Sequence, residues 1–250
     1  MFKVSGFSYV HNALEGGYPI VEVIQVMQPF TDEIVVVDAQ STDGTRQLLE
    51  RMAAKMSGSL RVLDGAWGDQ AGQTLAALHA MNTECRGDII IHAEGDEVWD
   101  GMLLAEVCRQ IKAGHHDIAV HRLQVSQNFQ RCRWYPYAVH RIFPKGTVNK
   151  VGHTTNREGD AILLGPLHGY LWDCTNCFRD NWRGRVQNQA ELWHGVASYK
   201  AVPFHFAESI EVADVGVFLN QAHWFWKRSP FDLPGPLRRL VGMTKYEPGV

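Results

Sequence analysis

The stretch that decides the fold is Asp32-Glu33-Ile34-Val35-Val36-Val37-Asp38-Ala39-Gln40-Ser41-Thr42-Asp43-Gly44-Thr45. Its first part is a β-branched run, which is typical of a strand buried on both faces of a parallel sheet. Its second part is rich in Ser, Thr and Asp, which favour the start of a helix. Asp38 stands where the predicted strand ends, so the stretch predicts a strand, a loop with a carboxylate at its mouth, and a helix.

The same alternation extends from the N-terminus to about residue 115 and predicts a doubly wound, mostly parallel α/β sheet. After Gly114 the pattern changes, and the region expected to follow is more irregular. Strands are expected at 118–125 and 138–143, and helical spacing runs through 178–199. We therefore divide the chain into an α/β half (1–115), a second half of the same domain (116–228) and a proline-containing C-terminal tail (229–250).

Composition is that of an ordinary globular protein, with 45% hydrophobic and 20% charged residues in 250. No apolar run reaches the roughly 18 residues that a membrane-spanning helix needs. The N-terminus lacks the apolar core of a secretory signal. Five scattered cysteines favour free thiols in a reducing compartment over a disulfide framework. These features predict a soluble cytoplasmic protein.

Charge is unevenly distributed along the chain, although the formal net charge is only −3. Residues 118–157 contain no Asp or Glu. The seven basic residues of this range are Arg122, Arg131, Arg133, Arg141, Lys145, Lys150 and Arg157. Such segregation predicts a surface that meets an anionic molecule. The alternative is that these residues pair with acids from elsewhere in the fold.

A second acidic element, Glu94-Gly95-Asp96-Glu97, follows the apolar run 89–91. Two carboxylates separated by one glycine can face the same divalent cation. Mn²⁺ and Mg²⁺ prefer oxygen ligands and leave positions for diphosphate oxygens. In an open parallel sheet, ligands collect where strands end. Asp38 and this acidic turn therefore predict a nucleotide site with a metal beside it.

These motifs resemble family-two glycosyltransferases of the GT-A fold, closest to those that add sugars in cell-envelope assembly. The resemblance rests on 4–12, on Asp32 to Thr45, and on Glu94-Gly95-Asp96 in the place of an Asp-x-Asp motif. It implies an enzyme that moves a sugar from a nucleotide-diphosphate donor. By this resemblance residues 1–115 would bind the donor and 116–228 would face the acceptor. The donor-binding residues would be Ser5, Phe7, Asn12, Asp38, Asp43 and Glu94.

The resemblance also implies a divalent metal, Mn²⁺ or Mg²⁺, and an inverting displacement. Asp96 would be the principal metal ligand, with Glu94 assisting. His168 would complete the site, and His153 and His205 compete for that role. A catalytic base would deprotonate the acceptor hydroxyl. Its candidates are Glu97, Glu158 and Asp173.

The acceptor is expected to be anionic, either an envelope or lipid-linked saccharide or a hydroxymethylated base in viral DNA. Cations alternate with aromatic side chains at 131–137, which suits phosphate contact and stacking on an extruded base. The expected acceptor-binding residues are Arg131, Arg133, Trp134 and Lys150. A non-catalytic binding module on the same fold is the alternative from another class.

Two further segments carry weaker signals. Cys174 and Cys177 have metal-ligand spacing without a second pair, so free thiols in the core are expected. The segment Trp224-Phe225-Trp226 could stack on a sugar or base, or form the apolar face of a helix.

Overall fold

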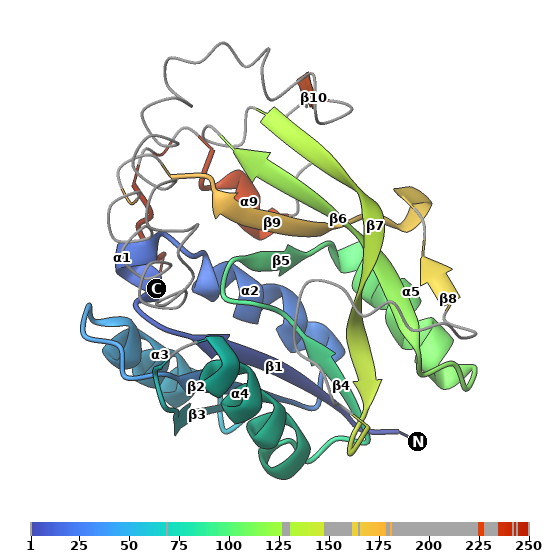
Figure 1. Ribbon diagram of the computed structural model, residues 1–250, viewed down its shortest axis with the longest axis horizontal. Coiled ribbons are helices and arrows are strands. Elements are labelled where there is room, and N and C mark those ends of the chain that lie inside the picture. The colour runs from blue at the N-terminus through green and yellow to red at the C-terminus, as the bar shows by residue number, and fades with distance from the viewer. Residues whose placement is uncertain are drawn as a thin grey trace.

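The structure is a computed structural model. It describes residues 2–68, 70–126, 131–147, 162–164, 166–178, 181, 225–227, 235–241, 243 and 245–249. In chain order its elements are β1 (Val4–Val10), α1 (Ala13–Gly16), α2 (Ile20–Met27), η1 (Gln28–Phe30), β2 (Glu33–Asp38), α3 (Thr45–Lys55), β3 (Leu60–Asp64), α4 (Gln70–Glu84), β4 (Ile89–His92), β5 (Glu97–Trp99), α5 (Gly101–Lys112), β6 (Ile118–Ser126), β7 (Arg131–Pro144), β8 (Ile162–Leu164), η2 (Pro166–His168), β9 (Leu171–Asn176), β10 (Phe225–Lys227) and α9 (Gly235–Arg238) (Figure 1).

One mixed sheet connects both halves of the chain. Its strand order is β3-β2-β1-β4-β7-β6-β9-β5, and β8 and β10 pair with β6 and β7. The first four strands are mutually parallel, as the alternating pattern predicts. β7 then pairs antiparallel with β4 and carries the second half onto the same sheet (Figure 1). The α/β architecture is therefore confirmed, with both antiparallel and parallel pairs beyond β4.

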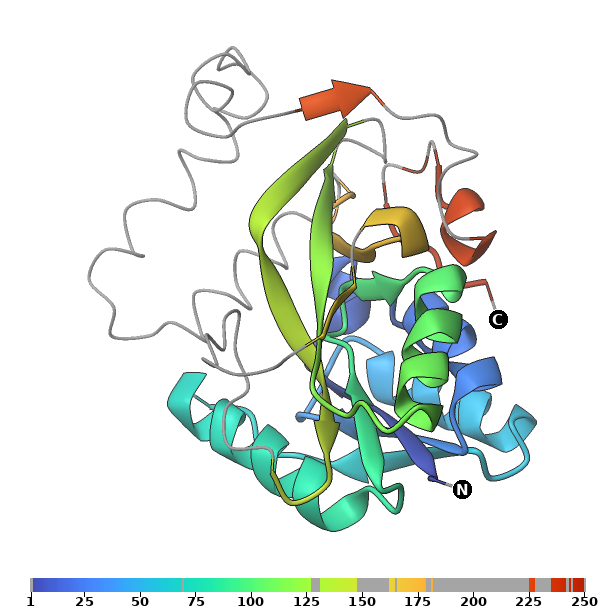
Figure 2. The same cartoon turned by 90° about the vertical axis from the view of Figure 1, so that its right-hand side faces the viewer.

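Helices cover both faces of the parallel strands because successive strand side chains point in opposite directions. On one face, Phe7, Val35 and Ile90 pack against α4. On the other face, Ile34 and Ile91 join a larger core that includes α2, α3 and α5. Figure 2 shows α4 on one side of the sheet and α5 on the other. Burial on both faces explains why β2 is apolar in nearly every position.

Local boundaries differ from the sequence expectations in two informative places. The helix expected to open at Ser41 to Asp43 begins at Thr45, after Gly44, whose φ of 96° suits glycine. Phe225 and Trp226 lie on β10, paired with β7, so the helical interpretation of this segment is wrong. The strands expected at 118–125 and 138–143 are confirmed as β6 and the end of β7.

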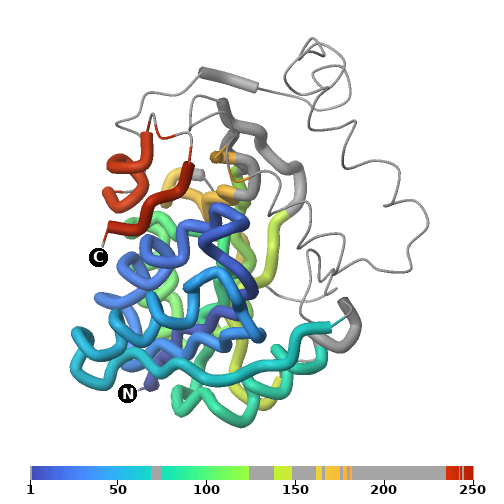
Figure 3. Tube along the Cα trace, turned by 90° about the vertical axis from the view of Figure 1, so that its left-hand side faces the viewer, coloured from blue at the N-terminus to red at the C-terminus, as the bar shows by residue number. Residues whose placement is uncertain are grey.

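The C-terminal segment packs against α2 (Figure 3). Leu237, Leu240 and Tyr246 are at most 3% exposed, so their segment belongs to the core and is not an extended tail. Tyr246 donates its hydroxyl hydrogen bond to the buried carboxylate of Glu22 at 2.9 Å. Arg239 pairs with the same carboxylate. The C-terminal segment thus supplies the partners that Glu22 needs inside the core.

No helix among the described residues is long and apolar enough to cross a membrane.

The buried Glu22 predicts an unusual pH dependence of stability. Burial raises its pKa above the usual 4.5, although Arg239 and Tyr246 act in the opposite direction. The folded state therefore binds this proton more tightly than the unfolded chain. This tighter proton binding by Glu22 stabilises the folded state below about pH 4.5. The stabilisation is lost as pH rises through the folded-state pKa.

We expect Glu22→Gln to flatten the pH dependence of the free energy of unfolding in that window, because glutamine does not titrate. Urea unfolding from about pH 4 to about pH 8 measures it. Glu50→Gln, at a half-exposed position of α3, is the matched control. Equal pH profiles for the wild type and Glu22→Gln would contradict the assignment.

Candidate active site

The carboxyl ends of β1, β2 and β4 meet at one edge of the sheet. The register pairs Val10 with Asp38, so the loops after β1 and β2 begin side by side. The chain leaves β4 on the other side of β1, where Gly95 lies against the side chain of Val10. The sequence-predicted Asp38 and acidic turn are therefore brought to the same edge, on either side of β1.

Asp38 is the last residue of β2 and is only 5% exposed. Its Oδ2 accepts a long hydrogen bond of 3.4 Å from the backbone N–H of Ser41. Its Oδ1 is buried and has no hydrogen-bond partner among the described residues. Buried carboxylate oxygens are nearly always hydrogen-bonded, so an unpaired one at a strand end is suited to a ligand donor.

The loops after β1 and β2 are held to each other by side-chain hydrogen bonds. Ser41 Oγ accepts from the backbone N–H of Asn12 at 2.8 Å, and Asn12 Oδ1 accepts from that of Thr42 at 2.7 Å. Both loops contain a non-glycine residue with positive φ, 45° at Asn12 and 57° at Gln40. Such strain persists only where neighbouring contacts impose it, and it is concentrated at functional sites.

Aromatic side chains lie beside Asp38. His11 stacks on Trp67, with ring centroids 3.7 Å apart and an interplanar angle of 12°. The Nδ1 atom of His11 lies 2.5 Å from the carbonyl oxygen of Ala39. Burial and the negative charge of Asp38 raise the pKa of Tyr9. Sequence reasoning missed Trp67, because nothing in its glycine-rich surroundings indicates that it stacks on a residue that follows β1.

The acidic turn is closed by its own hydrogen bonds. The backbone N–H of Glu97 donates to the carbonyl of Glu94 at 2.9 Å, and the backbone N–H of Glu94 donates to Glu97 Oε2 at 3.1 Å. Cys174 on β9 donates its N–H to the carbonyl of Asp96 at 2.8 Å. The turn is therefore fixed from within and from β9, while Glu94 and Asp96 are partly exposed.

A buried ion network lies beneath this turn. Arg141, 1% exposed on β7, donates to both carboxylate oxygens of Glu97 at 2.8 Å and to Glu94 Oε1 at 2.8 Å. Arg122 Nη1 lies 3.5 Å from Glu97 Oε1, and its Nε lies 3.8 Å from Asp173 Oδ2. Two of the seven basic residues in the acid-free stretch thus pair with acids inside the fold.

Electrostatics in this network follow from burial and from the two guanidinium groups. Burial acts to raise the pKa of Glu97, but the charge and hydrogen bonds of Arg141 outweigh it and lower that pKa to about 2. Burial and the charge of Arg141 lower the pKa of the neighbouring His92 to about 3. Glu97 is therefore ionised and His92 neutral at pH 7.

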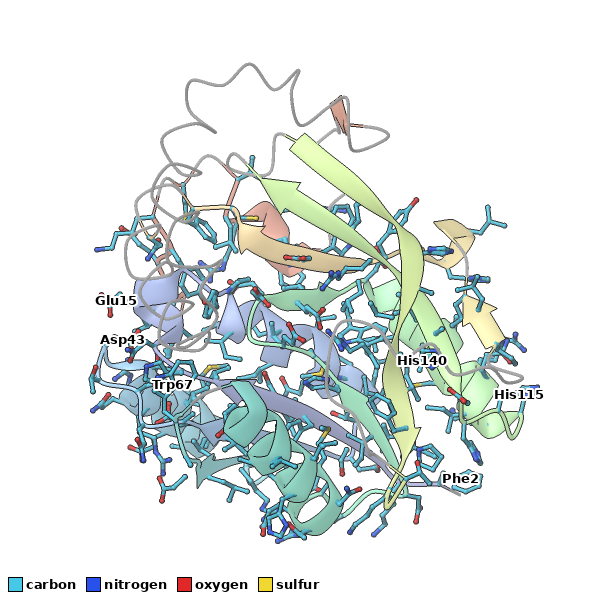
Figure 4. All side chains as sticks on the ribbon, in the orientation of Figure 1. Phe2, Glu15, Asp43, Trp67, His115 and His140 are labelled. Atoms are coloured by element: carbon cyan, nitrogen blue, oxygen red, sulfur yellow. The ribbon has the colours of Figure 1, made fainter. Side chains whose placement is uncertain are left out.

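Two of the expected donor-binding residues lie away from this edge of the sheet. Ser5 is at the amino end of β1, bonded to Glu33, and Phe7 is in the core below the edge. Asp43 accepts hydrogen bonds from the backbone N–H groups of Glu15 and Thr45, and thereby joins the starts of α1 and α3. Figure 4 shows Asp43 near Glu15, on the side of the molecule where Trp67 lies.

His168 is not brought to the acidic turn. The β5–β9 register pairs Glu97 with Asp173 and Trp99 with Leu171, so η2 lies beyond the opposite end of β5. There Gly169 contacts Asp100, and the charge of His168 acts on Glu106 of α5. Among the described residues, no group of three or more His, Cys, Asp or Glu is arranged to hold a metal.

The remaining expected residues fall outside the described side chains. Arg131, Arg133 and Trp134 belong to β7, and the structure describes their backbone but not their side chains. Lys150, His153, Glu158 and His205 lie outside the described residues. Cys174 and Cys177 are buried free thiols, as expected, and burial raises the pKa of Cys174 well above its usual value.

The comparison with protein families decides the class of this protein. Residues 20–172, more than half of the chain, match the family described as Glycosyl transferase family 2. The chain belongs to glycosyltransferase family 2. The expectations of a glycosyltransferase and of a nucleotide-sugar donor are thereby confirmed, and the observed sheet agrees with the GT-A expectation.

Two solved structures are among those to which this chain is similar. TarS 1–349 of S. aureus matches with a TM-score of 0.48 and 16% identity, over 86% of this chain and 74% of that one. Glucosyl-3-phosphoglycerate synthase from Mycobacterium tuberculosis, in complex with Mn²⁺, UDP and glucosyl-3-phosphoglycerate, matches with a TM-score of 0.36 and 20% identity. That match covers 49% of this family-2 chain and 44% of the synthase. No curated protein matches the chain.

The close contact at Gly95 predicts that the acidic turn tolerates no side chain there. A Cβ at Gly95 would lie 2.7 Å from Cγ1 of Val10, which is buried and β-branched and therefore stiff. We expect Gly95→Ala to cost about 1–3 kcal/mol of unfolding free energy. Gly101→Ala is the control, since a Cβ there meets no atom within 4 Å. Equal stability of the two variants, measured by urea unfolding, would contradict the prediction.

Proposed function

We propose that this family-2 glycosyltransferase uses a divalent cation held at Glu94 and Asp96, and transfers its sugar with inversion. The observation that carries the proposal is that one edge of the sheet holds both a buried carboxylate and partly exposed ones. Asp38 is buried, with Oδ1 unpaired within the described part of the chain, and the partly exposed Glu94 and Asp96 lie across β1 from it. Asp38 suits the donor's base or ribose, whereas Glu94 and Asp96 suit a cation that would meet the donor's diphosphate.

The acidic turn fits Mn²⁺ or Mg²⁺ by the chemistry of its donors. Both cations take oxygen ligands, and Mg²⁺ is commonly bound by one or two carboxylates together with substrate phosphates. A protein cluster of three ligands is therefore not required. A bound cation would stabilise the negative charge that develops on the departing diphosphate. Asp96 is the proposed principal ligand, with Glu94 beside it.

The transfer itself is a single displacement. The acceptor oxygen forms a bond to the anomeric carbon while the bond from that carbon to the diphosphate oxygen breaks. The hydroxyl proton passes to a basic side chain, and the nucleoside diphosphate leaves. Asp38 holds the base or ribose, which fixes the anomeric carbon relative to the acceptor.

The catalytic base is proposed to be Asp173 or Glu158. Glu97 is unsuited to the task because its carboxylate accepts two hydrogen bonds from Arg141 and has a pKa of about 2. A general base works best with a pKa near the operating pH. Asp173 lies beside the acidic turn on β9, opposite Glu97, at the longer 3.8 Å from Arg122. A role for Glu158 rests on the sequence alone.

The metal assignment predicts that Asp96→Asn lowers kcat by more than about 100-fold, because it removes a charged ligand. The matched control is Asp100→Asn, because Asp100 caps α5 through the N–H of Met102 and asparagine caps equally well. Thermal shift with UDP, GDP, CDP, TDP and their sugar conjugates, with and without Mn²⁺, first identifies the donor. Turnover of that donor is then measured for each variant. Retained turnover in Asp96→Asn, or shifts indifferent to Mn²⁺, would remove Asp96 as the ligand.

The acceptor is proposed to be anionic, although the basic stretch offers less free charge than the sequence suggests. Arg122 and Arg141 are buried in ion pairs, while Lys145 is exposed. Arg131 and Arg133 lie on β7 next to β10, at the end of the strand away from β4. This position is compatible with the proposed acceptor side, which residues 116–228 would form. A saccharide polyanion or DNA could supply the negative charge.

We expect Arg131→Ala combined with Arg133→Ala to weaken polyanion binding. The slope of log affinity against log salt concentration should fall by about one for each phosphate that the variant no longer neutralises. Fluorescence anisotropy with a DNA duplex and with an anionic glycan, at two salt concentrations, separates the two acceptor classes. Arg109→Ala combined with Lys112→Ala on α5 removes the same charge elsewhere. If the β7 variant binds the polyanion with unchanged, salt-insensitive affinity, this surface is excluded as the polyanion-binding site.

A further inference from the structure

The side chain that most constrains the acidic turn is Arg141, which belongs to neither the turn nor its strands. Its guanidinium reaches Glu97 with two hydrogen bonds and Glu94 with a third, all at 2.8 Å. Two parallel N–H···O bonds between a guanidinium and a carboxylate fix both position and orientation. Arg141 therefore holds the carboxylates on both sides of Asp96.

The hold on Glu97 is passed on to the backbone of the turn. The same carboxylate oxygen that accepts from Arg141 Nε also accepts from the backbone N–H of Glu94. The Asp96 carbonyl is held separately by Cys174 N–H. Removing Arg141 would leave a buried carboxylate, 1% exposed, without its main partner. Such a group relaxes toward solvent or takes up a proton, and the turn that it closes would move.

Charged side chains of both signs surround the turn. Four carboxylates gather there, from Glu94, Asp96, Glu97 and Asp173, and two guanidinium groups, from Arg122 and Arg141, lie among them. The arginines lie on the inner side, with side chains at most 7% exposed, whereas that of Glu94 is 31% exposed. The two arginines thus lie deeper in the fold than Glu94.

We propose that Arg141 is a positioning residue that orients Glu94 and the backbone of the acidic turn to receive a divalent cation. The proposal rests on the proposed function of this turn. Arg141 itself lies behind these carboxylates, with its side chain 1% exposed. Its guanidinium geometry matters as much as its charge, because one planar group must serve Glu97 and Glu94 together.

The test is the dissociation constant for Mn²⁺, measured by electron paramagnetic resonance of the free ion, with Mn²⁺ alone and with UDP present. Arg141→Lys keeps the charge and removes the two-pronged geometry. We expect it to weaken Mn²⁺ binding by about 10- to 100-fold, as for other residues that support a metal ligand. Arg109→Lys is the matched control, because Arg109 also makes two hydrogen bonds to one carboxylate, that of Glu106, but on the exposed surface of α5.

A second variant keeps the test decisive if Arg141→Lys fails to fold. The double variant Arg141→Met with Glu97→Met removes both members of the buried pair, and such replacements are often neutral for stability. We expect a folded protein whose Mn²⁺ affinity is still reduced by about 10-fold or more, since Glu94 then lacks its support. Thermal unfolding of each variant reports the fold independently of the metal.

The outcomes separate the two levels of the proposal. If either folded Arg141 variant binds Mn²⁺ as tightly as the wild type, with only its thermal stability lowered, Arg141 is structural and the inference is overturned. The proposed function would survive that result. If the wild type itself binds no Mn²⁺, alone or with UDP, the metal site is wrong and the inference fails with it.

Discussion

The ion pair between Glu97 and Arg141 joins the two halves of this protein at the place where its chemistry is expected. Glu97 begins β5, directly after the acidic turn, and Arg141 comes from β7, the antiparallel strand that extends the sheet beyond β4. Both side chains are 1% exposed, and each buried charge needs the other as its partner. The pair also bears on the shape of the turn, because Glu97 accepts the backbone N–H of Glu94 with the oxygen that Arg141 Nε contacts.

The opposite side of the site is built by backbone constraint. Asn12 and Gln40 adopt positive φ angles in the loops after β1 and β2, and cross-loop hydrogen bonds hold them there. Strained loops cost stability in the free protein, and so does Oδ1 of Asp38, which is buried without a partner in the described part of the chain. A ligand that donates to Asp38 would offset part of that cost, which is how a preorganised site acquires affinity.

Support for these loops comes from the far end of the chain. Asn181 donates to the carbonyl of Leu14 in α1 and accepts from the backbone N–H of Tyr246. Tyr246 in turn donates to Glu22 in α2. The C-terminal segment is thereby connected through Asn181 to the helix that follows Asn12. Residues more than 200 positions apart thus stabilise one corner of the site, because the buried Glu22 takes its side-chain partners, Tyr246 and Arg239, from the C-terminal segment.

The sequence by itself determined the parallel α/β half, the family and the two acidic positions. These follow from local signals: the β-branched run before Asp38, and the acid-glycine-acid pattern of Glu94, Gly95 and Asp96 after an apolar run. Only the tertiary structure decided which charges are used inside the fold. Arg141 looks like any other cation in a basic stretch, and its pairing with Glu97 depends on how β7 meets β4. Likewise, Ser5 and His168 lie away from the site because strand direction and register, which no local pattern encodes, place them at other edges of the sheet.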